Sequence, residues 1–201
     1  MNGGRWPGVR LPRSIAEAIV AHARVERPNE ACGVVIGSAR PADRGLARRY
    51  VPCRNAAASP SRFLVDRDDL LAVLAELDRS GEELWGVVHS HVRTAAVPSA
   101  TDVAEAAWPT AVYLVVSLAE AVDGARLDDD AGLRAWRIAD GGASELTLAI
   151  GEGAPDDGWL PGGELPNGDG NAADGRLDGG RLPAGGRPGG EGTPDGGRPA
   201  R

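Results

Sequence analysis

The pattern of hydrophobic and polar positions divides the first 150 residues into helices and strands. Residues 14–26 and 66–79 place apolar side chains three and four positions apart, which predicts two amphipathic helices. A shorter helix is predicted over 99–107. Continuous or alternating apolar runs predict strands over 29–37, 46–53, 84–90, 111–118, 133–138 and 145–150, with a brief strand at 63–65.

Three of these predictions are specific enough to be tested residue by residue. Asp66 is expected to cap the helix over 66–79, and Gly81 is expected to end it. The alternating run 133–138 is expected to be an outer strand of the sheet. The apolar positions of the helix over 66–79 are expected to form its buried face: Leu70, Leu71, Val73, Leu74 and Leu77.

Two or three helices among some six strands indicate the mixed α/β class, a mixed sheet with helices packed on it. Residues 151–201 are different, because they hold 17 of the 29 glycines and 7 of the 15 prolines and almost no aliphatic clusters. Such a segment buries too little apolar surface to offset its ordering entropy. We therefore expect a flexible N-terminus over 1–10, one folded domain over 11–150 and a disordered tail over 151–201.

The composition of the chain bears on which kinds of partner the protein binds and on where in the cell it is expected. The formal net charge of −7 argues against a non-specific nucleic-acid or anionic-membrane binder. No apolar run is long enough to span a bilayer and no signal-peptide pattern is visible, so we expect no membrane partner and a cytoplasmic location. Cys32 and Cys53 are then expected to be buried thiols rather than a disulfide, and His22 a structural residue of its helix.

The candidate chemistry is concentrated in one motif, H-x-H-x7-S-x2-D, which the chain reads as His89, His91, Ser99 and Asp102. The histidines end a predicted strand, and Ser99 is the expected N-cap of the following helix with Asp102 at its third position. Two imidazoles and a carboxylate can bind a metal and leave one coordination position open. The spacing also permits a plainer interpretation, in which the histidines are strand-end residues beside ordinary polar neighbours.

With a glutamate upstream, the motif resembles that of the JAMM (MPN+) metallopeptidases, E…H-[ST]-H-x7-S-x2-D, without a spacing error. The segment 30–37 also looks like the family's first strand, and the similarity runs from about residue 11 to 150. The resemblance implies the cytidine-deaminase-like JAB1/MPN fold, a central mixed sheet flanked by helices. The positions that match the motif are Glu30, His89, Ser90, His91, Ser99 and Asp102.

Carried over to this chain, the resemblance implies that His89, His91 and Asp102 ligate one Zn²⁺ per chain. Glu30 would act as general base and then general acid, and Ser99 would donate a hydrogen bond to the developing oxyanion. Ser90 is expected to be structural, because on an alternating strand it points away from the two histidines. One departure is Val92, which stands where many relatives have a proline directly after the second histidine.

The activity implied by the family is hydrolysis of an amide or isopeptide bond after the C-terminal glycines of a small β-grasp protein, either ubiquitin-like or a sulfur carrier. Within the family the chain looks most like the short, insertion-free actinobacterial form. That form implies release of cysteine from a carrier–cysteine adduct in cysteine biosynthesis. No ubiquitin-chain-binding insertion is present, so selectivity for polyubiquitin is not implied.

Three other functions compete with this one. A non-catalytic MPN-type carrier-binding module generally lacks the metal ligands, whereas here all of them are present. A RadC-like member of the family shares the ligand spacing but has an HNHPSG-type loop that is missing after His91. A zinc deaminase needs H-x-E and P-C-x-x-C, and Pro52-Cys53 has no second cysteine. The metal content of the purified protein separates the binding module from the peptidase.

Overall fold

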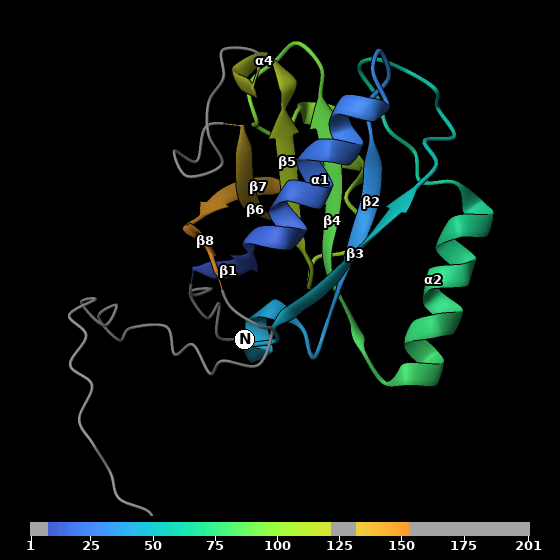
Figure 1. The fold of residues 1–201 in the computed structure, drawn as a ribbon, viewed down its shortest axis with the longest axis vertical. Helices are drawn as coiled ribbons and strands as arrows, with labels where there is room; N and C mark the ends of the chain where they lie inside the picture. Colours follow the sequence, from blue (N-terminus) through green and yellow to red (C-terminus); the bar gives the residue numbers. More distant parts are fainter. Residues whose placement is uncertain (1–7, 122–131, 153–201) are drawn as a thin grey trace, which may run out of the picture. The chain divides into compact units, whose positions relative to one another are not determined.

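A computed structural model of the chain describes residues 8–121 and 132–152, and it has the predicted mixed α/β class (Figure 1). The rest of the predicted tail, from residue 153, and the first seven residues lie outside the described part. The helices are α1 (Arg13–Val25), α2 (Arg67–Ser80), α3 (Ala100–Glu105) and α4 (Leu118–Ala121), with a 3-10 turn η1 (Pro41–Asp43). The strands are β1 (Val9–Pro12), β2 (Cys32–Gly37), β3 (Ala47–Cys53), β4 (Glu83–His91), β5 (Val112–Ser117), β6 (Leu133–Ala139), β7 (Gly142–Leu146) and β8 (Leu148–Gly151).

Six of the strands form one mixed sheet in the spatial order β3-β2-β4-β5-β6-β7. β4 and β5 run parallel, and every other neighbouring pair is antiparallel. β4 therefore lies inside the sheet, where His89 is paired with Cys32 on one side and with Val115 on the other. A residue at this position is shielded by both neighbouring strands.

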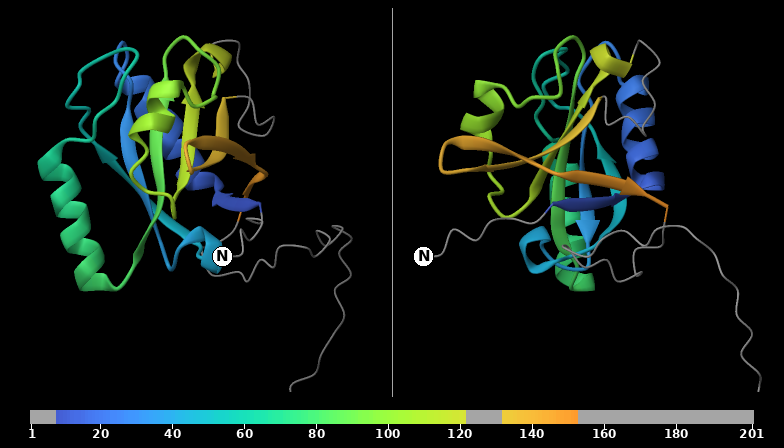
Figure 2. Two further views of the ribbon diagram at one scale, coloured as in Figure 1. Left: turned by 180° about the vertical axis from the view of Figure 1, so that it is seen from behind. Right: turned by 90° about the vertical axis from the view of Figure 1, so that its left-hand side faces the viewer.

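The two faces of the sheet are covered by different helices, and Figure 2 (right) shows α1 and α3 on opposite sides. α1 packs Ala16, Ile19 and Ala23 against alternate strand residues such as Val35 and Val88. The other face contacts α2 and α3 through a second apolar cluster of buried and partly buried side chains. Its members include Val34, Val73, Leu77, Val87, Val103, Tyr113 and Val115.

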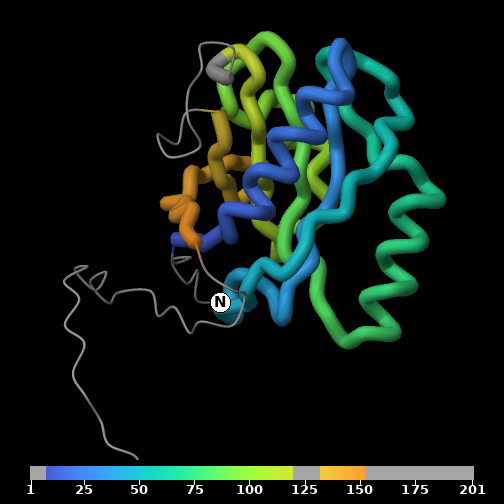
Figure 3. The backbone as a smooth tube through the Cα atoms, viewed as in Figure 1, coloured from blue at the N-terminus to red at the C-terminus, as the bar shows by residue number. Residues whose placement is uncertain are grey.

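The two ends of the described chain meet in a separate two-stranded sheet. β1 and β8 run parallel, with Val9 paired to Leu148 and Leu11 paired to Ile150 (Figure 3). Val9 is 5 % exposed, so it belongs to the core, although residues 1–10 were expected to be flexible. The run predicted as one strand over 145–150 is divided at Thr147, because its second half leaves the main sheet to pair with β1.

Other sequence predictions are corrected by the structure. The strand over 133–138, expected at the edge, is β6 and lies between β5 and β7. The stretch 63–65 makes only an isolated bridge between Val65 and Asn55. On α2 only Val73 is fully buried, and Leu71 is 52 % exposed. Helical periodicity identifies the apolar side of a helix, but it does not tell how completely a second layer covers that side.

The predicted cap and end of α2 and the predicted state of the two cysteines are confirmed. Asp66 accepts hydrogen bonds from the backbone N–H groups of Asp68 and Asp69 and so caps α2, and Gly81 ends the helix with φ of 70°, a conformation that favours glycine. Cys32 and Cys53 are buried free thiols.

Among residues 8–121 and 132–152, no helix combines the length and the apolar character needed to cross a bilayer.

Candidate metal centre

Two buried histidines lie at the end of β4, on the face of the sheet that contacts α2 and α3. His89 is fully buried and His91 is 6 % exposed. Alternate residues of a strand point to the same side, so both rings face α3 while Ser90 between them faces α1. The Nε2 atoms of the two rings are 3.2 Å apart. The H-x-H spacing thus produces two adjacent imidazole nitrogens.

Asp102 joins the histidines from the first turn of α3. Its Oδ2 lies 3.5 Å from His89 Nε2 and 3.4 Å from His91 Nε2. The N-cap of the helix is Ser99, whose Oγ accepts the Asp102 backbone N–H at 3.2 Å, while Asp102 Oδ2 accepts the Ser99 backbone N–H at 2.6 Å. This reciprocal pair of bonds determines both where the helix begins and where the carboxylate points.

The three side chains form a donor set that fits a divalent metal ion. One ligand atom from each lies within 4.8 Å of the others. A carbonyl oxygen only accepts hydrogen bonds, so His91 Nδ1 donates to the Ala95 carbonyl at 2.8 Å and leaves the Nε2 lone pair for a metal. Two imidazole nitrogens and one carboxylate oxygen are ligands that zinc accepts, and three protein ligands leave a fourth position open.

The electrostatics of the cluster favour a charged carboxylate. Burial alone would raise the pKa of Asp102, but hydrogen bonds with His89 and His91 hold this pKa well below its usual range. Burial lowers the pKa of His89, so this ring is held neutral. For His91, burial would also lower the pKa, yet the bonds with Asp102 and the Ala95 carbonyl raise it overall. His89 and Asp102 are therefore in the forms that bind metals, a neutral imidazole and an ionised carboxylate.

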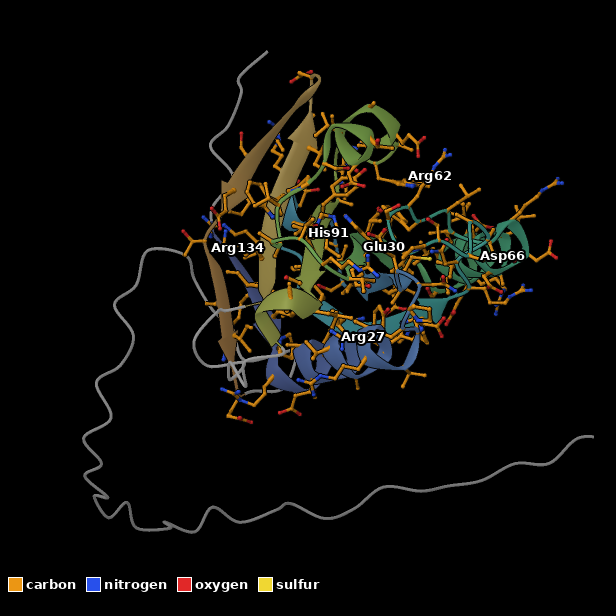
Figure 4. The ribbon with its side chains drawn as sticks, turned by 90° about the horizontal axis from the view of Figure 1, so that it is seen from above. Arg27, Glu30, Arg62, Asp66, His91 and Arg134 are labelled. Carbon is orange, nitrogen blue, oxygen red and sulfur yellow. The ribbon has the colours of Figure 1, made fainter. Side chains whose placement is uncertain are left out.

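Glu30 lies two residues before β2 and is buried, at 5 % exposed. Figure 4 shows its side chain beside His91. Burial is the main cause that raises the pKa of Glu30 from its ordinary value near 4.5 to about 7; His91 lowers it and Asp102 raises it further. A carboxyl group with this pKa can both accept and release a proton near neutral pH.

The backbone around Glu30 is held on both sides. Its N–H donates to the Ser59 carbonyl at 2.9 Å, and its carbonyl accepts from Asn55 Nδ2 at 2.9 Å. The next N–H, of Ala31, donates to Ser90 Oγ at 2.8 Å, and the Ser90 N–H donates back to the Ala31 carbonyl. Ser90 has the structural position predicted for it, and that position joins Glu30 to the strand of the two histidines.

Ser99 has its oxygen committed to the helix cap, since it accepts the Asp102 N–H. A hydroxyl has one proton to donate besides its acceptor lone pairs. The Ser99 O–H can therefore still donate a hydrogen bond. The same contact that caps α3 fixes the position of this donor.

Three residues around the site were not predicted from the sequence. Phe63 stacks on His89, with ring centroids 4.3 Å apart and an interplanar angle of 14°. Asn55 holds the Glu30 carbonyl, and Arg62 forms an ion pair with Glu105 of α3. The sequence of residues 55–60 predicts only a turn, and that of residues 63–65 predicts a short strand that includes Phe63. No spacing rule connects this loop with the motif near residue 90.

The chain is similar to several known proteins. The family model for prokaryotic homologs of the JAB domain matches residues 12–139. A CysO-cysteine peptidase of Mycobacterium tuberculosis is 37% identical over 138 residues, which are 69% of this chain and 88% of that protein. A desampylase of Haloferax volcanii is 34% identical over 112 residues, 53% of this chain and 78% of that protein. A protein of Desulfitobacterium hafniense with a known solution structure is similar at a TM-score of 0.60 and 30% identity, covering 72% of this chain and 94% of its own.

Proposed function

The chain belongs to the family of prokaryotic JAB-domain proteins, and from this premise we propose that it is a zinc-dependent peptidase. Its substrate is a small β-grasp protein, a sulfur carrier or ubiquitin-like, and the bond it hydrolyses is the amide or isopeptide bond after the carrier's C-terminal glycines. The observation that carries the proposal is the cluster of His89, His91 and Asp102 beside a buried glutamate whose pKa is about 7.

In this proposal His89 Nε2, His91 Nε2 and an Asp102 oxygen hold the zinc ion. A zinc ion held by these three ligands would supply Lewis acidity and would lower the pKa of a water molecule at the site to about 7. Glu30 accepts a proton from the attacking water and delivers it to the nitrogen of the leaving group. Ser99 donates a hydrogen bond to the oxygen that becomes negatively charged on the scissile carbonyl.

The relatives support the choice of substrate. Two of them are named for activity on small proteins or their adducts, a CysO-cysteine peptidase and a desampylase, and a third is a probable TtuB-protein conjugate cleaving protease of Thermus thermophilus. The first of these is matched over 88% of its length. We therefore favour an adduct in which one cysteine follows the carrier's last glycine, so that hydrolysis releases cysteine and regenerates the carrier.

The test is mass spectrometry of sulfur carriers from the same organism, each extended by one C-terminal cysteine, after incubation with the purified protein. We expect the mass of the extended carrier to fall to that of the unextended one, chelation to stop the reaction, and added zinc to restore it. An unextended carrier serves as the matched control. If the protein contains one zinc ion and binds the carrier but never shortens it, the proposed peptidase activity is wrong and the protein is a non-catalytic binding module.

A further inference from the structure

An exposed ion pair joins the two segments that flank the metal centre. Arg62, in the loop between β3 and α2, places its guanidinium Nη2 2.6 Å from Glu105 Oε1 at the end of α3. Glu105 lies three residues, or about one helical turn, after Asp102. The side chains are 56 % and 46 % exposed. The loop and α3 are therefore connected at the surface by a contact that is open to solvent.

The loop also fixes Arg62 relative to Glu30. The Asn55 side-chain amide donates to two carbonyls, those of Glu30 at 2.9 Å and Arg62 at 3.1 Å. Phe63, the next residue after Arg62, stacks on the ring of His89. In Figure 4, Glu30 and Arg62 both lie on the α2 side of His91. The Asn55 side chain thus fixes the backbone of Arg62 relative to the backbone of Glu30, the proposed acid–base residue.

Through Asn55, the backbone of Arg62 lies near that of Glu30, on the same side of His91. In the proposed function, Glu30 protonates the nitrogen that departs, so the released amino acid lies next to Glu30. A C-terminal amino acid carries an α-carboxylate one carbon from that nitrogen, whereas the side-chain amine of an isopeptide-linked lysine does not. A planar guanidinium binds carboxylates through paired N–H donors, and Arg62 already holds one, that of Glu105.

We propose that Arg62 is a specificity residue that binds the free α-carboxylate of the leaving amino acid, which replaces Glu105 as its partner. An exposed ion pair of this kind contributes little to stability, so exchanging one carboxylate for another costs little. The enzyme then prefers adducts that end in a single amino acid over isopeptide-linked conjugates. The inference rests on the proposed function and adds to it the residue that recognises the leaving group.

The experiment compares two carrier adducts that differ only at the last group, cysteine with a free carboxylate and cysteine carboxamide. We expect the zinc-loaded wild-type protein to favour the carboxylate by about tenfold or more in kcat/KM, as a charge-assisted contact does. In Arg62→Gln this ratio should fall to near one, and Arg62→Lys should restore part of it. Arg40→Gln is the matched control, because Arg40 forms a comparably exposed ion pair with Asp43, with side chains 49 % and 52 % exposed.

A second measurement separates binding from chemistry. In a Glu30→Gln background, which is expected to trap uncleaved adduct, the carboxylate form should bind more tightly than the carboxamide only when Arg62 is present. Equal cleavage of both adducts by the wild-type protein, or an equal loss on both in Arg62→Gln, would overturn the specificity role and leave a structural ion pair. Cleavage of neither adduct would overturn the proposed function itself, and this inference with it.

Discussion

The two faces of the central sheet differ in how completely their helices are buried and in whether they hold the candidate site. On one face, α1 buries four side chains against the strands, and Ala16, Ile19 and Ala23 are at most 1 % exposed. On the other face, α2 fully buries only Val73 and α3 buries no residue, yet this side holds Glu30 and the metal-ligand cluster. The comparison indicates that α1 is packed more tightly on the sheet than α2 and α3 are, so that the chemistry can be removed while the fold remains.

The largest effect is expected from Glu30→Gln. If Glu30 transfers the proton, its loss should lower kcat by about 10²–10⁴-fold, the usual contribution of a general acid–base group. The fold should be kept, because glutamine has the same shape and the α1 face is untouched. Steady-state hydrolysis of the extended carrier measures the loss. Glu17→Gln, on the exposed side of α1, is the control and should have wild-type activity.

The α1 face is tested by a pair of truncations. Ile19→Ala should lower the free energy of unfolding by about 2–5 kcal/mol, because it empties a fully packed position. Leu71→Ala, at a position of α2 that is 52 % exposed, should cost less than about 1 kcal/mol. Urea denaturation measures both values. Similar losses for the two variants would contradict the difference between the faces.

The buried carboxyl predicts a dependence of stability on pH. The folded-state pKa of Glu30, about 7, exceeds its ordinary value near 4.5, so folded metal-free protein binds this proton more tightly than the unfolded chain. The resulting stabilisation is complete below 4.5 and is lost as the pH rises through about 7. Relative to the wild type, metal-free Glu30→Gln should therefore gain up to about 3 kcal/mol between about pH 5 and pH 8.

Thermal or urea denaturation of chelator-treated protein at the two pH values checks this prediction. Glu30 also raises the pKa of His91, so the difference between variant and wild type reports the Glu30 carboxyl together with its effect on His91. A difference that stays constant with pH would mean that the Glu30 carboxyl is not buried in the folded protein.

Ser90 is expected to affect both the stability of the fold and the position of Glu30. Ser90→Ala removes the acceptor of the Ala31 N–H and should lower stability by about 1–3 kcal/mol. Because that bond holds the residue next to Glu30, we also expect kcat to fall by about tenfold, an effect of misplacing the group. Ser38→Ala is the matched control, since Ser38 Oγ accepts the Leu46 N–H away from the site. Ser38→Ala should lower stability without lowering kcat. Equal effects of the two variants on kcat would contradict a positioning role for Ser90.

Much of this arrangement could be predicted from the sequence because it depends on local periodicity. Strand alternation puts His89 and His91 on one side, and the capping position of Ser99 brings Asp102 to them. The mixed α/β class follows in the same way from the runs of apolar residues. The roles assigned to these residues stay predictions until the protein is assayed.

The features that sequence reasoning missed all depend on contacts between distant segments. Phe63 meets His89 across 26 positions of the chain, and Asn55 meets Glu30 across 25, and neither distance has a periodic signature. β8 departs from the main sheet because its partner β1 lies at the other end of the described chain. Leu71 is exposed because coverage of α2 is a property of the assembled layers and not of the helix.

The most direct test of the account is the metal content of the protein. Wild type and Asp102→Asn are purified identically, zinc is measured by mass spectrometry, and circular dichroism checks the fold. We expect about one zinc ion per chain in the wild type and a large loss in Asp102→Asn, whose fold is retained because asparagine can still serve in the helix cap. A wild-type protein that hydrolyses its substrate without metal, or a variant that keeps its full zinc content, would contradict the account.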